Sequence, residues 1–284
     1  MKPYLRIPSL ILALLLALCA AGCGRAGPDP ERHLEAARQK LEGAQALEAY
    51  LDTDITMSAM GSSFSLTASA DTVFFADPLA RKTETRAALS GALNEYAARY
   101  AVEEGEAVAV YTFRSAEGWT REEMDREEYP VLYPPPRAAA LLTLATGERS
   151  GLSAAEDELR GVPVTRVEGM LAADASREVL LSYGLIDGLT SALDAEMAAA
   201  VAESVTEADK AIPAVLFLDG EDTLLRAELD LTPLMKPIVN KVLSYMGDTA
   251  LAALVKVGDC TVSVDFEDAE DIDRFALPSG IFEP

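Results

Sequence analysis

The sequence predicts an α+β fold, in which helices pack on one face of a curved antiparallel sheet. Several stretches alternate apolar and polar residues with a period of two, which is typical of strands that bury one face and expose the other to water. Alanine-rich stretches with helical spacing lie between them. The strands and helices follow one another in blocks, and this order favours an antiparallel sheet over a regular βαβ fold.

The first element expected is a helix over residues 30–51. Its apolar residues recur every three to four positions, as in a helix that buries one side, at Leu34, Ala37, Leu41, Ala44, Leu47 and Leu51. Strands are expected next at 54–60 and 64–75, joined by a hairpin at 61–63. Two further strand regions are expected at 80–89 and 106–119, each after a short turn.

The clearest hairpin of the sequence lies at 214–231, with its turn at 219–222. Its second arm alternates strictly, and its apolar face carries Leu225, Ala227, Leu229 and Leu231. The stretch 257–268 repeats this pattern around Cys260. Both are expected to be half-buried antiparallel strands with one wet face.

Three helical regions are expected among these strands. The stretch 137–146 is one, and 174–208 is expected to form two helices broken near Gly184 or Gly188. The third is 234–253, which has Pro237 near its start.

The N-terminus has the pattern of an export signal. Lys2 and Arg6 precede an apolar run that is shorter than a membrane span and ends in small residues. The last four residues of this run, 20–23, resemble the lipobox of bacterial lipoproteins, in which the cut falls before the cysteine and the thiol takes a diacylglycerol. We therefore expect residues 1–22 to be a signal peptide and Cys23 to be lipidated. The alternative is an ordinary secretory signal that leaves Cys23 as a free thiol.

The remaining chain is expected to hold a lipidated tether, 23–31, and one domain, 32–284. Cys260 then has no intrachain partner, and we interpret it as a small buried hydrophobe. The formal net charge of −23 repels nucleic acid and anionic lipid headgroups, which excludes nucleic acid as a partner. Attachment to a membrane must therefore come from the acyl chains, and two chains on one cysteine suffice for it.

The sequence contains little that predicts catalysis. It has a single histidine, His33, and lacks a nucleophile elbow or a phosphate-binding loop. The acidic clusters at 121–128 and 265–273 do not match a calcium loop, and we interpret them as solvated surface. No cofactor, metal or catalytic residue is expected, although a hydrolase with two carboxylates remains an open alternative.

A hydrophobic ligand is the more specific expectation. Apolar strand residues are plentiful enough to line one concave face of the sheet, and helices either fill that concavity or leave a cavity beneath them. The small side chains of 138–145 and 192–202 favour a cavity, since they fill less volume than a closed core normally uses. The candidate ligand-binding residues are Met57, Phe64, Leu66, Val110, Phe113, Ala140, Leu225, Leu229, Val262 and Val264.

Several motifs, taken in order, resemble the LolA/LolB and LppX/LprG group of exported lipid-handling proteins. They are a helix followed by DITMSAM, then VFFADPLARKTETR, VEEGEAVAVYTF, LRGVPVTRVEGML, LFLDGEDTLLRAELDL and VSVDFEDAEDIDRFALP, which together span roughly 32–278. The resemblance implies a half-open antiparallel barrel (a half-barrel), its concave side covered by helices, with an apolar pocket for acyl chains. The chain departs from the group at Phe217 and Leu218, where Trp and Ile are common, and its helical inserts are longer.

The function expected from these observations is that of a membrane-anchored bacterial lipoprotein on the extracytoplasmic side. It would bind or transfer a lipid, or the acyl chain of an acylated protein, without catalysis. The alternative is an envelope structural or interaction lipoprotein whose core is filled, and the third possibility is the carboxylate hydrolase.

The lipid anchor predicts a simple fractionation result. Cys23→Ala should release the protein from the membrane fraction, because the acyl chains are its only expected anchor. Fractionation of cells that express the wild type and the variant measures this. If the variant stays in the membrane fraction, the lipobox interpretation is wrong.

Overall fold

The computed structural model describes residues 28–90, 93–115, 118–146, 151–184, 195–207, 209–245, 255–267, 272 and 274–282. The strands are β1 (Ala46–Ala59), β2 (Ser62–Ala76), β3 (Leu79–Leu89), β4 (Leu93–Glu104), β5 (Ala107–Arg114), β6 (Gly118–Asp125), β7 (Ser153–Leu159), β8 (Val162–Leu171), β9 (Ile212–Leu218), β10 (Leu224–Asp230) and β11 (Lys256–Phe266). The helices are α2 (Pro30–Glu42), α3 (Tyr129–Leu132), α4 (Ala138–Leu141), α5 (Ala173–Ser182), α7 (Ala195–Thr206), α8 (Thr232–Tyr245) and the 3₁₀ helix η1 (Ser279–Phe282).

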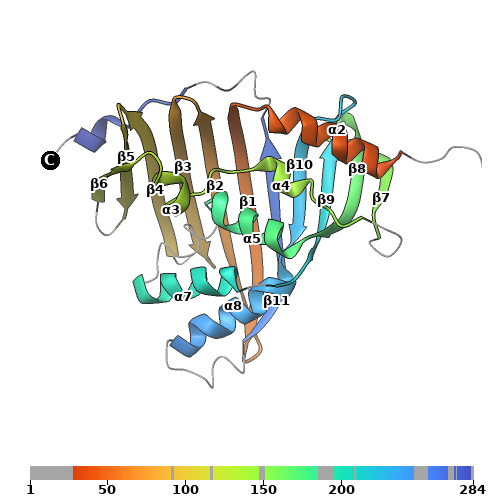
Figure 1. Ribbon diagram of the computed structural model, residues 1–284. Coiled ribbons are helices and arrows are strands. Elements are labelled where there is room, and N and C mark those ends of the chain that lie inside the picture. Colours follow the sequence, from red (N-terminus) through yellow and green to blue (C-terminus); the bar gives the residue numbers. More distant parts are fainter. Residues whose placement is uncertain are drawn as a thin grey trace, which may run out of the picture.

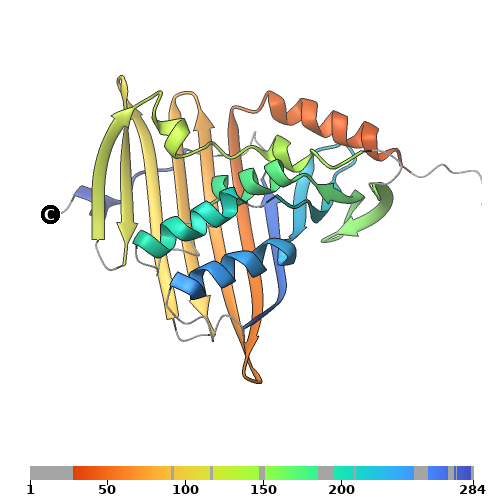
Figure 2. The same ribbon diagram turned by 60° about the horizontal axis from the view of Figure 1, so that its bottom comes forward.

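The strands form one unclosed antiparallel sheet in the order β6-β5-β4-β3-β2-β1-β11-β10-β9-β8-β7. The α-helices lie together on one face of it, here called the helix face, and the opposite face is called the open face (Figures 1 and 2). The predicted α+β class, a curved antiparallel sheet with helices on one face, is therefore confirmed. The chain enters α2 beside β7 and β8 and ends beyond β6, at the other end of the sheet (Figure 1).

Local sequence explains where most elements begin and end. The Asp29 side chain accepts hydrogen bonds from the N–H groups of Glu31 and Arg32, which caps α2 at its start. Met60 and Gly61 both have positive φ at the β1–β2 turn, which is the geometry of a tight hairpin. Gly184, with φ of +78°, follows α5, as expected for the break within 174–208.

The predicted helix at 30–51 is too long, because α2 ends at Glu42 and β1 begins at Ala46. The end of that stretch fits both the helical spacing of three to four residues and the strand spacing of two. Leu47, Ala49 and Leu51 alternate with polar or exposed positions, and this alternation continues to Ile55. Since Ala49, Leu51 and Ile55 are all buried, pairing with β2 and β11 decides in favour of the strand. The helix predicted at 137–146 is likewise shorter, and only Ala138–Leu141 is helical.

The predicted alternation at 225–231 is correct for Ala227, Leu229 and Leu231, which are buried, but wrong for Leu225. The register between β9 and β10 shifts between Leu224 and Arg226, so Leu224 takes the buried position opposite Leu218. A bulge of this kind adds one residue to a strand and moves its side chains by one place. Leu225 is therefore only partly buried.

The core lies between the sheet and the helices. One continuous apolar cluster joins β1, β2 and β8–β11 to α2, α4, α5, α7 and α8. On the open face, the segment after β11 returns across the strands from β2 to β6, where Phe275, Leu277 and Ile281 pack on a cluster of aromatic residues. Each face of the β2–β6 half is thus covered by a different part of the chain.

Substitutions at Leu229 and Glu228 test which side of β10 is buried against the helices. Leu229→Asp should lower the free energy of unfolding by at least about 4 kcal/mol, because it places a charge in the apolar core. Glu228→Gln, one residue away on the exposed face, should change it by less than about 1 kcal/mol, since it removes only an exposed ion pair with Arg226. Urea unfolding of both variants measures the difference. Equal losses would contradict the register.

Candidate functional site

Half of the ten predicted ligand-binding residues lie in filled core. Val110 is 2% exposed and packs in a small cluster with Met124 and Tyr129, while the other four belong to the main core cluster. Those four are Ala140, Leu229, Val262 and Val264. The helices therefore fill this part of the sheet, which is the arrangement expected of a closed core.

Three predicted residues lie elsewhere on the helix face, toward the β1–β2 hairpin. Met57 is paired across the strands with Phe64 on one side and Val257 on the other, and Leu66 is paired with Ile55. Met57, Phe64, Leu66 and Val257 are only partly buried, whereas the residues farther along the same strands are fully buried. We call these four residues the hairpin patch.

Phe113 is not on this face. Its pairing partner on β4 is Ala98, and it packs against Tyr96 and Trp119 in the aromatic cluster of the open face. Strand residues three positions apart point to opposite faces, so Val110 and Phe113 cannot line one cavity. Placing both on the concave face was therefore wrong, as was placing Leu225 in line with Leu229.

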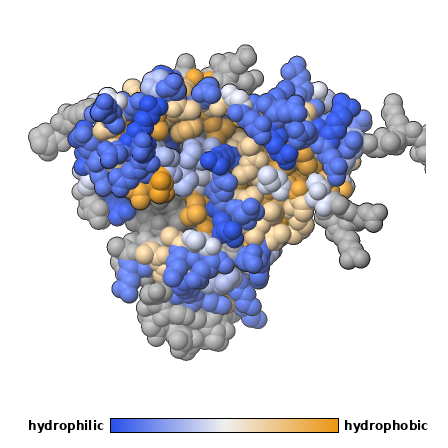
Figure 3. Space-filling model, in the orientation of Figure 1, coloured by the Kyte–Doolittle hydropathy of each residue, from blue (hydrophilic) through white to orange (hydrophobic). Residues whose placement is uncertain are grey.

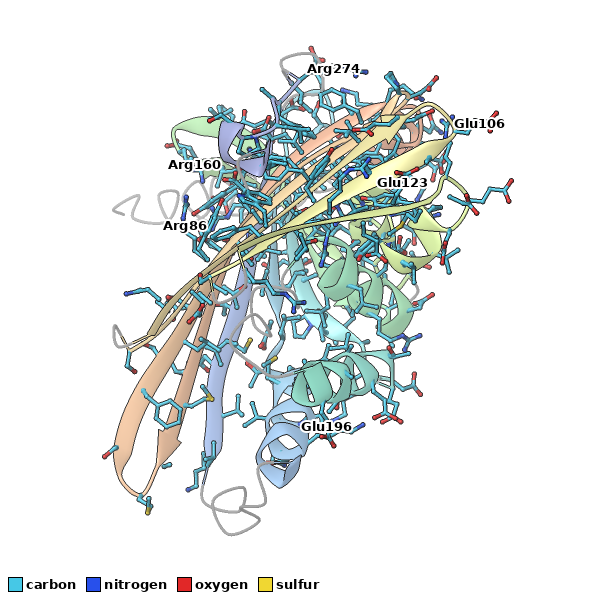
Figure 4. The ribbon with its side chains drawn as sticks, turned by 90° about the vertical axis from the view of Figure 1, so that its left-hand side faces the viewer. Arg86, Glu106, Glu123, Arg160, Glu196 and Arg274 are labelled. Carbon is cyan, nitrogen blue, oxygen red and sulfur yellow. The ribbon has the colours of Figure 1, made fainter. Side chains whose placement is uncertain are left out.

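The open face carries a hollow of about 890 Å³ that extends over β1–β4 and β9–β11. Each pair of neighbouring strands adds to the twist of a sheet, and Figure 4 shows how far the strands of this sheet diverge from one another. Arg86 lies on this side, away from the helices (Figure 4), and its guanidinium sits 5.7 Å from the centre of the Tyr96 ring. The lining mixes polar and apolar surface, and its acidic residues are Asp52, Asp54, Glu95, Glu228 and Asp230.

These acids do not form a catalytic pair. Asp52 and Asp54 stand on β1, and Glu228 and Asp230 stand on β10, with β11 between the two strands, while Glu95 stands on β4. Side chains on one face of a sheet stand roughly parallel, so the acids lie beside one another and do not face each other across a cleft. Among the described residues, no group of three or more His, Cys, Asp or Glu is arranged to hold a metal ion. The hollow thus lends no support to the carboxylate hydrolase.

A buried polar site that the sequence pattern did not reveal lies on the helix face, centred on Arg81 of β3. This side chain is 6% exposed, and its guanidinium donates to Thr83 Oγ1 at 3.3 Å, Pro134 O at 2.9 Å and Ser182 O at 2.6 Å. It therefore connects the sheet to the loop before α4 and to the end of α5. The alternation of 80–89 contained a signal, since Arg81, Thr83 and Thr85 share one face, but the sequence does not say which face is buried.

Two tyrosines share this site with Arg81. Burial raises the pKa of Tyr183, and the charge of Glu178 raises it further, while Arg81 lowers it. Burial also raises the pKa of Tyr129, against the opposite influence of the positive charges of Arg81 and Arg99. Both phenols thus stay protonated at neutral pH and are available as hydrogen-bond donors.

Cys260 lies deep in the core, as predicted for a small buried hydrophobe. Burial, with the nearby charges of Asp230 and Asp54, raises the pKa of its thiol to about 12, so the thiol is protonated and unreactive at neutral pH. Cys23 lies outside the described residues, as does all of the predicted signal peptide. No helix within the described ranges is long and apolar enough to cross a membrane.

No protein-family model and no curated protein matches the chain. Among solved structures, LprF from Mycobacterium bovis is 11% identical, with a TM-score of 0.46 over 90% of this chain and 100% of LprF. A putative outer membrane lipoprotein-sorting protein domain from Vibrio parahaemolyticus is 10% identical, with a TM-score of 0.23 over 84% of this chain and 92% of that one. A LolA superfamily protein from Nitrosomonas europaea is 9% identical, with a TM-score of 0.17 over 90% and 98%.

These structures carry names from the group that the sequence motifs resemble. All three TM-scores are below 0.5, so any function has to be argued from the geometry of the chain itself.

Gly184 tests how α5 is fixed to the sheet beside Arg81. A Cβ atom at this position would lie 2.6 Å from Cγ2 of Thr83, and the backbone has a positive φ. Gly184→Ala should therefore lower the free energy of unfolding by about 2 kcal/mol or more. Gly43→Ala is the control, because nothing lies within 4 Å of its Cβ position and its φ is −93°. Urea unfolding that gives equal losses would contradict this docking of α5 on β3.

Proposed function

We propose that the protein is an exported, lipid-anchored protein that binds an apolar chain, such as the acyl chain of a lipid or of an acylated protein, on its helix face. The hairpin patch is the main observation that supports the proposal. Met57, Phe64, Leu66 and Val257 form adjoining cross-strand pairs on this face, and the described helices leave them partly exposed.

Partly exposed apolar side chains that lie together, rather than singly, are typical of binding surfaces. Methionine suits a site that takes flexible chains, because its side chain is unbranched and polarizable. From the helix side, polar residues cover the outer surfaces of the helices and apolar residues show between them (Figure 3). An acyl chain laid against the patch would continue the apolar core toward the hairpin.

The anchor and the location of the protein follow from Cys23. A diacylated Cys23 would hold the protein at the extracytoplasmic surface of the membrane, and α2 begins only seven positions later, at Pro30. The excess of acidic residues supports attachment through acyl chains, because it disfavours direct binding to anionic headgroups. Lipid or an acylated protein is then the expected partner, and the proposal requires no catalytic step.

A second function is favoured by a specific observation, namely the filled core at Val110, Ala140, Leu229, Val262 and Val264. A lipoprotein with this core and no ligand would serve as a structural or interaction protein of the envelope. The two functions differ in whether the domain takes up an acyl chain at all.

Binding of a fluorescent acyl probe distinguishes the two functions. The full-length Cys23→Ala protein should bind the probe with a Kd of 1 μM or lower, which corresponds to about −8 kcal/mol or stronger. Phe64→Asp should weaken binding at least tenfold, because it places a charge in the patch. Tyr50→Asp is the matched control: Tyr50 is 45% exposed, pairs with Asp71 and Asp265 on the open face, and should change the Kd less than twofold.

No detectable binding, with a Tm that added probe does not change, would favour the structural protein. Equal losses in Phe64→Asp and Tyr50→Asp would mean that the probe binds elsewhere.

A further inference from the structure

Arg81 is a buried charge whose hydrogen-bond acceptors are all neutral. They are one threonine hydroxyl and the backbone carbonyls of Pro134 and Ser182. Among the described residues, no carboxylate lies within ion-pair distance of Arg81. A buried guanidinium normally has an anionic partner, because burial removes the water that would otherwise stabilise its charge.

In the described part of the chain, three hydroxyl groups near Arg81 are buried without a hydrogen-bond partner, and their residues, Thr72, Ser182 and Tyr183, are all 1% exposed or less. The equally buried Tyr129 hydroxyl lies beside the Arg81 guanidinium. Buried polar groups are nearly always hydrogen-bonded, so three such groups beside a charge that has no carboxylate partner among the described residues require an explanation.

Their positions on the helix face place them around the guanidinium. Thr72 is paired across the strands with Thr83, which accepts from Arg81, and Ser182 supplies the carbonyl that Arg81 binds at 2.6 Å. Arg81 and Arg99 both lie close enough to Tyr129 for their charges to lower its pKa, and the charges of Glu178 and Arg81 act in opposite directions on the pKa of Tyr183. Arg99 brings a second positive charge to this region, and its guanidinium lies 4.5 Å from the centre of the Tyr133 ring.

We propose that Arg81, with the hydroxyls of Thr72, Tyr129, Ser182 and Tyr183, binds the anionic head group, a carboxylate or phosphate, of the ligand whose acyl chain lies at the hairpin patch. This inference rests on the proposed function. A guanidinium has five N–H donors, of which Arg81 uses three, and each free hydroxyl adds another donor. Carboxylate and phosphate oxygens only accept hydrogen bonds, so they match this set of donors. Water would satisfy the hydroxyls but would leave the charge unpaired.

The distance to the hairpin patch suits a long acyl chain. Thr72 and Leu66 lie on the same face of β2, six residues apart, which is about 20 Å along a strand. The side chains between them on this face are those of Ala70 and Ala68, which are small but buried in the main core cluster, so the helices over them have to move to admit the chain. One end of the path is therefore cationic and rich in donors, and the other is apolar, as in an amphipathic lipid with a single charged end.

Binding requires a rearrangement at the site. The four hydroxyl oxygens have almost no accessible surface, so the segments around Pro134 and Ser182 have to separate from Arg81 to admit a head group. Arg81 then exchanges neutral carbonyl acceptors for a charged one, and charge-assisted hydrogen bonds are the stronger kind.

Three ligands with the same chain test the proposal: hexadecanoate, hexadecyl phosphate and the neutral hexadecanol. Their affinities for the full-length Cys23→Ala protein are measured by displacement of the acyl probe. At least one anion should bind ten or more times more tightly than hexadecanol, and the tighter of the two anions identifies the head group. Arg81→Gln should abolish this preference and leave the affinity for hexadecanol within twofold. Arg86→Gln, on the same strand but on the open face, should leave the preference intact.

Tyr183→Phe provides a test that does not depend on the folding of Arg81→Gln. Removing an unpartnered buried hydroxyl should raise the Tm of the ligand-free protein by about 2–4 °C and lower its affinity for the anion about threefold.

An unchanged affinity of Tyr183→Phe for the anion would contradict the inference. So would equal binding of all three ligands by the wild type, or a preference for anions that persists in Arg81→Gln. If hexadecanol binds without any preference for anions, only the head-group site fails, whereas if none of the three binds, the acyl-binding function fails with it.

Discussion

The antiparallel pairing of β1 with β11 is the interaction on which the rest of the structure depends. It joins the first strand of the chain to the last, from Ala49–Phe266 to Ser58–Lys256, and so connects the meander β1–β6 to the strands β7–β11. Because paired side chains share a face, this register also aligns the apolar residues of both halves into one surface. The helices have a continuous core to cover only because the two halves meet in this register.

The helix face is not uniform, and this variation relates the fold to its proposed function. Over β8–β11 the described part of this face is an apolar core, which requires only coverage by helices. Over β2–β4 it contains a buried arginine and several hydroxyls, which apolar packing cannot satisfy. Toward the β1–β2 hairpin it becomes apolar again but is less covered. A charged site and an apolar surface on one face are the two features that an amphipathic ligand requires.

Much of the fold could be predicted because it depends on local alternation. The strands at 54–60, 64–75, 80–89 and 257–268 and the break near Gly184 were all evident in the sequence. The candidate site was less predictable, since Val110, Leu229 and Val264 are apolar strand residues whether they line a cavity or fill a core. Apolar character favours burial but does not identify what a residue is buried against. The faces assigned to Phe113 and Leu225 were wrong for two reasons. Successive strand residues point to opposite faces, so Phe113 faces away from Val110, and a bulge shifts this alternation by one residue at Leu225.

The sequence by itself determined the class of the fold, the wet and buried sides of its clearest strands and the buried, inert state of Cys260. These properties follow from period, composition and solvation, which are local to a segment. Only the tertiary structure decided that 46–51 is strand, that Leu224 replaces Leu225 in the core, and that Arg81 lies inside. Two of these outcomes depend on partners more than 100 residues away in sequence, β11 for β1 and Ser182 for Arg81, and the position of Leu224 depends on a bulge in the pairing of β10 with β9. Such partners are chosen by the pairing of the whole sheet, which no single segment encodes.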